Sequence, residues 1–117
     1  MGKATILIVE DSPDIAEPLA DAFRFEGFEV LQAANAVQAL QIASEHRPDL
    51  ILMDIQMPEM DGLEATRRIM AEHPYLKIVM LTVSEEDRSL FDAIKAGAQG
   101  YLLKKMEPDE FLAMVRG

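Results

Sequence analysis

The sequence predicts an α/β protein built on one doubly wound, five-stranded parallel sheet. Short apolar runs alternate five times with amphipathic segments of helical spacing along the 117 residues. In addition, the most apolar of these runs end in an acid or a hydroxyl rather than in a simple turn. Consecutive parallel strands must be joined by crossovers, which are usually helices, so this alternation requires helices on both faces of the sheet.

The most apolar runs are predicted to be the central strands because strands buried on both faces read as continuous hydrophobic segments. These runs are residues 5–9, 50–55 and 77–82. Residues 28–33 contain Glu29 and Gln32, and residues 100–104 form only a short run, so both segments are predicted to be edge strands. The strand order 2-1-3-4-5 satisfies all of these preferences.

The first helix carries a local conflict. Ser12 and Pro13 suit a helix start, and Gly27 suits its end. Pro18 lacks the N–H that would bond the carbonyl of Asp14 in a helix beginning at Pro13. We therefore expect the regular helix to begin a few residues later or to be kinked.

Four helices are expected to face the sheet through apolar stripes at helical spacing. The stripes are Ile15, Leu19, Ala22 and Phe23, then Val37, Leu40 and Ala43, then Leu63, Thr66, Ile69 and Met70, and finally Leu90, Phe91 and Ile94. Asn35 is expected to cap the second helix, and Ser84 with Asp87 to form a capping box for the fourth, which Gly97 ends. A last helix is expected from Pro108 to Gly117, with Phe111, Leu112 and Val115 on its apolar side.

Composition excludes several classes of function. The formal net charge of −10 argues against direct contact with nucleic acid by this domain. The absence of cysteine excludes disulfides and thiolate metal sites and fits a cytoplasmic location. No apolar run approaches the roughly 20 residues of a membrane span, and the first residues lack a signal-peptide pattern. No membrane association is therefore expected.

Polar residues close the predicted strands. Glu10 and Asp11 follow the first strand, Asp54 and Thr82 close the third and fourth, and Lys104 closes the fifth. Because the carboxyl ends of parallel strands meet at one edge of the sheet, we expect these side chains to converge. Each has an ordinary explanation when it is taken alone, such as a helix N-terminus for the two acids or a solvated edge for the lysine. Together they would require five coincidences, which favours a site.

This set of groups predicts metal-assisted phosphoryl chemistry. Neighbouring carboxylates repel one another unless a cation lies among them. With no cysteine, and with His46 and His73 expected on distant helix ends, Mg²⁺ or a similar oxygen-preferring ion is the expected occupant. Asp54 could then act as an in-line nucleophile toward a phosphoryl group neutralised by the metal and Lys104. The sequence has no glycine-rich phosphate loop, so a nucleotide ligand is not expected.

Over essentially its full length, residues 1–117, the chain resembles the receiver domain of a two-component response regulator. The resemblance is carried by Glu10-Asp11, Asp54, Met57-Pro58, Met60-Asp61-Gly62, Thr82 and the segment from Gly97 to Lys104. It implies a flavodoxin-like (βα)5 receiver fold. Gly100-Tyr101-Leu102-Leu103-Lys104 followed by Lys105 is most similar to the NarL/FixJ class, whose members usually carry a DNA-binding helix-turn-helix after the receiver. We expect one receiver domain at 1–117 and no output domain within it.

The resemblance implies a role for each residue. Asp54 would accept the phosphoryl group, Thr82 would hydrogen-bond it and Lys104 would pair with it. Tyr101 would rotate between outward and inward positions as Thr82 moves. Mg²⁺ would be bound directly by Asp11 and Asp54, mainly through water by Glu10, and by the backbone carbonyl of Gln56.

The expected function is a phosphorylation-activated switch, not an enzyme acting on an outside substrate. The donor would be a sensor histidine kinase or a phosphotransfer protein. Phosphorylation would favour a homodimer and control transcription through an output domain elsewhere. Two alternatives remain open: an aspartyl-nucleophile phosphatase, for which 117 residues leave no cap or substrate pocket, and a non-phosphorylated scaffold of the same fold.

Overall fold

The sheet has the predicted architecture and strand order. The computed structural model describes residues 3–55, 62–83 and 88–104. Five parallel strands pair in the order β2-β1-β3-β4-β5. The strands are β1 (Thr5–Val9), β2 (Glu29–Ala33), β3 (Leu50–Asp54), β4 (Ile78–Thr82) and β5 (Gly100–Leu103). The assignment of β2 and β5 to the edges is confirmed.

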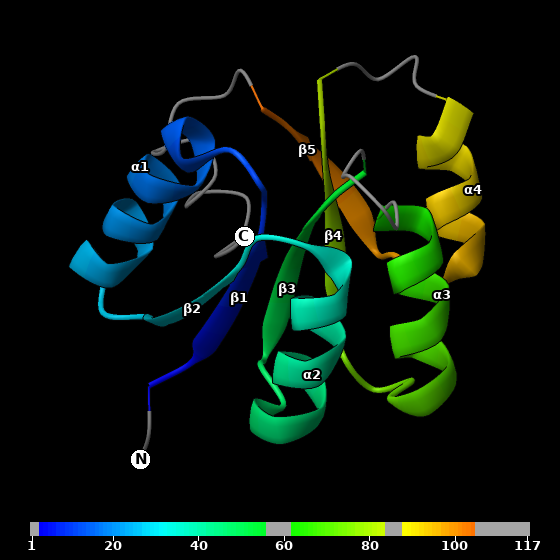
Figure 1. The fold of residues 1–117 in the computed structure, drawn as a ribbon, viewed down its shortest axis with the longest axis horizontal. Helices are drawn as coiled ribbons and strands as arrows, with labels where there is room; N and C mark the ends of the chain where they lie inside the picture. The colour runs from blue at the N-terminus through cyan, green and yellow to red at the C-terminus, as the bar shows by residue number, and fades with distance from the viewer. Residues whose placement is uncertain (1–2, 56–61, 84–87, 105–117) are drawn as a thin grey trace.

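Helices cover both faces of this sheet. In Figure 1, α1 lies on one side, and α2, α3 and α4 lie on the other. The helices are α1 (Pro13–Phe25), α2 (Ala36–His46), α3 (Gly62–Glu72) and α4 (Arg88–Ala96). The capping box expected at Ser84 and Asp87 and the last helix expected at residues 108–117 lie outside the described residues.

The central strands are buried on both faces because successive side chains enter different cores. In β1, Leu7 and Val9 pack in the core beneath α2, α3 and α4. Ile6 and Ile8 point the other way and pack beneath α1. This alternation explains why the strand sequence is continuously apolar instead of alternating with polar residues.

Helix α1 begins at Pro13 and continues through Pro18, so the expectation of a later start is wrong. Ser12 occupies the N-cap position, but its side chain makes no capping hydrogen bond. The Ser12 carbonyl instead accepts the first helical bonds, from Ile15 N–H and Ala16 N–H at 3.1 and 3.0 Å. Pro18 lies on the exposed side of the helix, whereas the opposite side is buried against the sheet. Packing of that buried side therefore outweighs the missing hydrogen bond.

Helix α2 begins as predicted but buries a different stripe. The Asn35 side chain accepts a hydrogen bond from Gln38 N–H at 2.9 Å, as an N-cap should. The buried residues are Ala36, Ala39 and Ala43, whereas Val37 is 55 % exposed. Small side chains let the helix approach the sheet closely, so the inner stripe is made of alanine and the predicted Val37 lies outside it.

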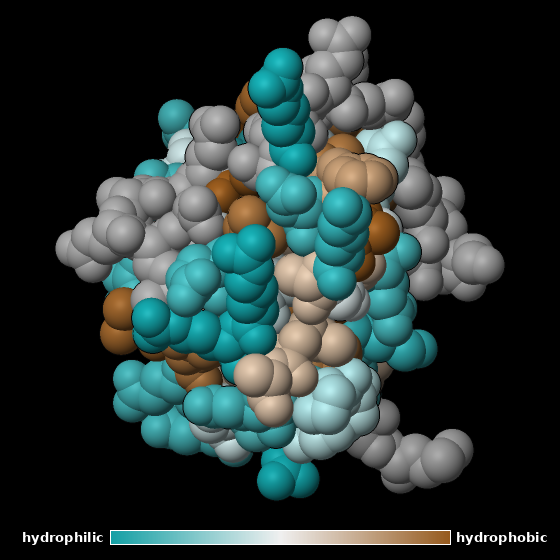
Figure 2. Space-filling view, turned by 90° about the vertical axis from the view of Figure 1, so that its right-hand side faces the viewer, coloured by the Kyte–Doolittle hydropathy of each residue, from teal (hydrophilic) through white to brown (hydrophobic). Residues whose placement is uncertain are grey.

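Helix α4 also buries side chains other than those predicted. Leu90 and Ala93 are buried, but Phe91 is 65 % exposed and Ile94 is also exposed, so their predicted place in the core is wrong. The side of the molecule that carries α3 and α4 accordingly mixes apolar and hydrophilic surface (Figure 2). Among the described residues, no helix combines the length and apolar character that crossing a membrane requires.

Candidate functional site

The carboxyl ends of β1, β3 and β5 meet at one site. Register aligns Val9 of β1 with Met53 of β3, so the next residues, Glu10 and Asp54, leave neighbouring strands at the same level. Glu10 stays in the sheet hydrogen-bond pattern because its N–H donates to the Ala33 carbonyl of β2 at 3.1 Å. The topology alone therefore places two acids from distant parts of the chain side by side.

Three predicted acids form one cluster. Glu10, Asp11 and Asp54 each offer a carboxylate oxygen within 4.8 Å of the other two. Glu10 and Asp54 are buried, with 5 % and 2 % of their surface exposed, whereas Asp11 is exposed. It is the only such group of three acidic or imidazole ligands within the described parts of the chain. The site thus has two deep oxygen ligands and one at its mouth.

Lys104 joins the cluster directly. Its Nζ lies 2.8 Å from Glu10 Oε2 and 2.9 Å from Asp54 Oδ1, and its side chain is largely buried. The Lys104 backbone N–H also donates to the Thr82 carbonyl at 2.8 Å, which fixes the chain just after β5 against the end of β4. One lysine therefore connects the ends of β1, β3, β4 and β5.

Burial and charge act in opposite directions on these groups. Burial raises the pKa of Glu10 above its ordinary value. The hydrogen bond to Lys104 lowers this pKa, but the negative charge of the neighbouring Asp54 raises it again. Burial tends to lower the pKa of Lys104, but hydrogen bonds and attraction to Glu10 and Asp54 outweigh it, so the pKa is raised. Lys104 is therefore positively charged at neutral pH, and the three acids outnumber it.

Thr82 and Tyr101 lie on the adjacent strands β4 and β5. Thr82 is the last residue of β4 and is buried. Tyr101 of β5 is the register partner of Met80, two residues before Thr82, and its side chain is exposed. Gln56, the predicted donor of a backbone carbonyl, lies outside the described residues.

Sequence reasoning missed the close packing between Gly62 and Asp54. Gly62 N–H donates to the Ile55 carbonyl at 2.8 Å. A Cβ on Gly62 would overlap the Asp54 carbonyl oxygen and lie 2.8 Å from the carbonyl carbon. Only glycine can therefore begin α3 at this place. Gly62 belongs to the Met60-Asp61-Gly62 motif of the sequence, but no sequence pattern indicates its contact with Asp54.

The donor set fits a hard divalent cation. The clustered ligands are carboxylate oxygens, which suit Mg²⁺, and among the described residues neither sulfur nor imidazole joins them. The histidines lie elsewhere: His46 ends α2 and His73 follows α3. The acids outnumber the one lysine, so the cluster retains negative charge that a divalent cation would neutralise.

Comparison with known proteins places this arrangement in a family. The family model "Response regulator receiver domain" matches residues 6–116. Chemotaxis protein CheY of Bacillus subtilis is 37 % identical over 111 residues, covering 94 % of this chain and 92 % of that protein. The structure of chemotaxis protein CheY4 of Vibrio cholerae superposes with a TM-score of 0.92 at 30 % identity and covers 98 % of each chain.

Other relatives are longer. DNA-binding response regulator MtrA of Mycolicibacterium smegmatis is 37 % identical over 114 residues, which are 97 % of this chain but 50 % of that protein. The chain thus spans half the length of MtrA and nearly all of the CheY proteins. Because these relatives carry both chemotaxis and DNA-binding names, the NarL/FixJ class is not confirmed. The chain belongs to the response regulator receiver domain family of two-component signalling.

Proposed function

We propose that Asp54 is the phosphoacceptor of this receiver domain. The observation that carries the proposal is the burial of Asp54 at the end of β3, within 4.8 Å of two further carboxylates and 2.9 Å from the Lys104 ammonium. The donor is the phosphohistidine of a sensor histidine kinase or phosphotransfer protein. An Asp54 carboxylate oxygen attacks phosphorus, the new O–P bond forms, and the N–P bond breaks with its electron pair returning to the imidazole.

The surrounding residues have defined roles in this proposal. Lys104 pairs with a phosphoryl oxygen, and the Thr82 hydroxyl hydrogen-bonds another. Glu10, Asp11, Asp54 and the Gln56 carbonyl would hold Mg²⁺, which when bound supplies positive charge against the phosphoryl oxygens. The ordered set of acids supports this assignment because two of its members are buried and would otherwise repel.

The consequence of phosphorylation is a change at the β4–β5 side of the molecule. A phosphoryl group adds about −1.5 to −2 charges at Asp54. Thr82 moves toward that charge, and Tyr101 turns from its exposed position toward the space that Thr82 leaves. A cytoplasmic homodimer acting through an output domain of the NarL/FixJ type is the proposed downstream state, with no contact between this domain and nucleic acid.

Phosphoramidate labelling tests the assignment. Wild-type protein is incubated with phosphoramidate and Mg²⁺, and peptide mass spectrometry locates the phosphoryl group. We expect near-stoichiometric label on the Asp54 peptide and none in Asp54→Asn, which keeps the fold but removes the nucleophile. Label persisting in Asp54→Asn would refute the site. Turnover of donor with no trapped adduct would indicate a phosphatase, and no label from any donor would indicate a scaffold.

A further inference from the structure

The start of α3 rests directly on the backbone of Asp54. Gly62 has no Cβ, and a Cβ at this position would overlap the Asp54 carbonyl oxygen and lie 2.9 Å from Ile55 Cα, so the Gly62 backbone packs directly against both residues. Gly62 N–H donates to the Ile55 carbonyl at 2.8 Å. The first turn of α3 is therefore in direct contact with the end of β3.

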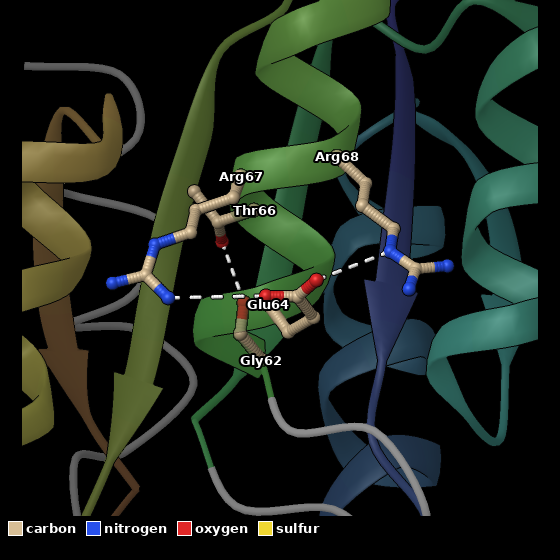
Figure 3. Close-up of polar contacts among 5 residues, drawn as sticks. All are labelled: Gly62, Glu64, Thr66, Arg67 and Arg68. Atoms are coloured by element: carbon tan, nitrogen blue, oxygen red, sulfur yellow. Dashed lines mark hydrogen bonds and ion pairs between the residues drawn. The ribbon is translucent and has the colours of Figure 1, made fainter.

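A buried hydroxyl holds that first turn. Thr66 Oγ1 donates to the Gly62 carbonyl at 2.7 Å, one turn earlier in α3, and lies 3.5 Å from Met80 Sδ of β4. Thr66 has no solvent-exposed surface. Figure 3 shows this hydroxyl directed at Gly62, while Glu64 makes ion pairs with Arg67 and Arg68. Those ion pairs are solvent-exposed and contribute little.

The two possible acceptors around the Thr66 hydroxyl are the Gly62 carbonyl at the start of α3 and the Met80 sulfur of β4. A hydroxyl has one proton, and the carbonyl at 2.7 Å is a far better acceptor than the sulfur at 3.5 Å. The bond therefore goes to Gly62, which contacts Asp54. The sulfur contact reaches Met80, whose register partners are Met53 of β3 and Tyr101 of β5.

We propose that Thr66 is a positioning residue for phosphoryl transfer, acting through Gly62 on the Asp54 backbone. The inference rests on the proposed role of Asp54. A threonine inside a helix can also bond the carbonyl four residues earlier simply to satisfy its own hydroxyl. Thr66 differs because that carbonyl belongs to the one helix residue whose backbone touches Asp54 closely enough to exclude a Cβ.

Variant kinetics separate positioning from simple stability. Thr66→Val keeps the shape and removes the hydroxyl. Ile69→Val is the matched control, since Ile69 is equally buried one turn later and contacts the same core. The rate of Asp54 labelling by phosphoramidate and the rate of hydrolysis of the phosphorylated protein are measured together with the melting temperature. We expect the labelling rate of Thr66→Val to fall roughly threefold to tenfold, the scale of one buried hydrogen bond.

Rescue by the conservative variant completes the test. Thr66→Ser retains the hydroxyl and should label at the wild-type rate, whereas Ile69→Val should lose melting temperature only. If Thr66→Val does not fold, Thr66→Ser and Thr66→Ala, which differ by the hydroxyl alone, should show the same rate difference. Equal labelling rates in all variants would overturn the role of Thr66 while leaving Asp54 as phosphoacceptor. Wild-type protein without label would instead refute the proposed function itself.

Discussion

Asp11 differs from its two acidic neighbours in being exposed, so its contribution to cation binding can be measured without disturbing the buried ion pairs. Glu10 and Asp54 are each held by Lys104, whereas Asp11 is at the mouth of the cluster. Removing Asp11 therefore leaves the Lys104 contacts in place and deletes one oxygen ligand. This makes Asp11→Ala the cleanest probe of cation binding among the three acids.

Mg²⁺ should stabilise wild-type protein more than Asp11→Ala. A ligand at tenfold excess over its Kd stabilises the native state by about 1.4 kcal/mol, which is roughly 5 °C in melting temperature for a domain of this size. We expect the variant to show less than half of that shift in calorimetry at the same Mg²⁺ concentration. Asp14→Ala, an exposed acid in the first turn of α1, is the matched control and should behave as wild type. Equal shifts in all three proteins would remove Asp11 from the metal site.

The sequence predicts that the residues at the strand ends converge because the topology of the sheet, and not the detail of side-chain packing, brings them together. Glu10, Asp54 and Lys104 meet because parallel strands in the order β2-β1-β3-β4-β5 end at one edge. The helical pattern of the sequence places Thr66 on the side of α3 that faces the sheet, but it does not indicate the partner of the Thr66 hydroxyl. Its partner depends on the path of the chain around Gly62, and no periodicity in the sequence encodes that contact.

At the level of elements, α2 and α3 begin where the sequence predicts, but α2 and α4 turn a different face to the sheet from the predicted one. Val37 is larger than the alanines of α2, and Phe91 is the largest apolar residue of α4, so hydrophobicity alone predicts that both are buried. The structure buries Ala36, Ala39 and Ala93 instead. The distance between helix and sheet decides which side chains fit beneath the helix, and sequence spacing does not contain that distance.

Pro18 offers a test of how tertiary packing overrides helix propensity. Pro18→Ala restores a backbone N–H that can bond the Asp14 carbonyl and removes the clash of the proline ring. Because Pro18 is exposed within α1, no packing is lost. We expect the free energy of unfolding to rise by about 1–3 kcal/mol, read from the urea midpoint at constant m-value. Ala22→Gly in the same helix, which should be destabilising, calibrates the response. A stability equal to or below wild type would mean that the rigid proline stabilises the chain by restricting its unfolded state.

For the whole molecule, Lys104 is the group that ties the last described strand to the first and third. Two buried carboxylates from β1 and β3 face its ammonium at 2.8 and 2.9 Å. Breaking a buried ion pair by removing one partner is costly because a buried charge is left without compensation. The same three groups would be rearranged by phosphorylation, so the fold and the proposed switch depend on one set of contacts.

Lys104→Met should therefore destabilise the entire domain and not only its β5 edge. We expect a loss of about 3 kcal/mol in the free energy of unfolding without metal, measured by urea denaturation. Lys104→Met/Asp54→Asn should recover much of the loss because the second change removes one of the two like charges that repel each other. Mg²⁺ should also recover part of the lost stability in the single variant, since a cation among the acids replaces the missing ammonium.

Lys95→Met is the control for this prediction. Lys95 lies on the exposed surface of α4, where its Nζ lies over the Phe91 ring, and its replacement should cost little stability. If Lys104→Met were as stable as wild type in the absence of Mg²⁺, repulsion between Glu10 and Asp54 would be too weak to require a cation, and the electrostatic argument for the metal would fail.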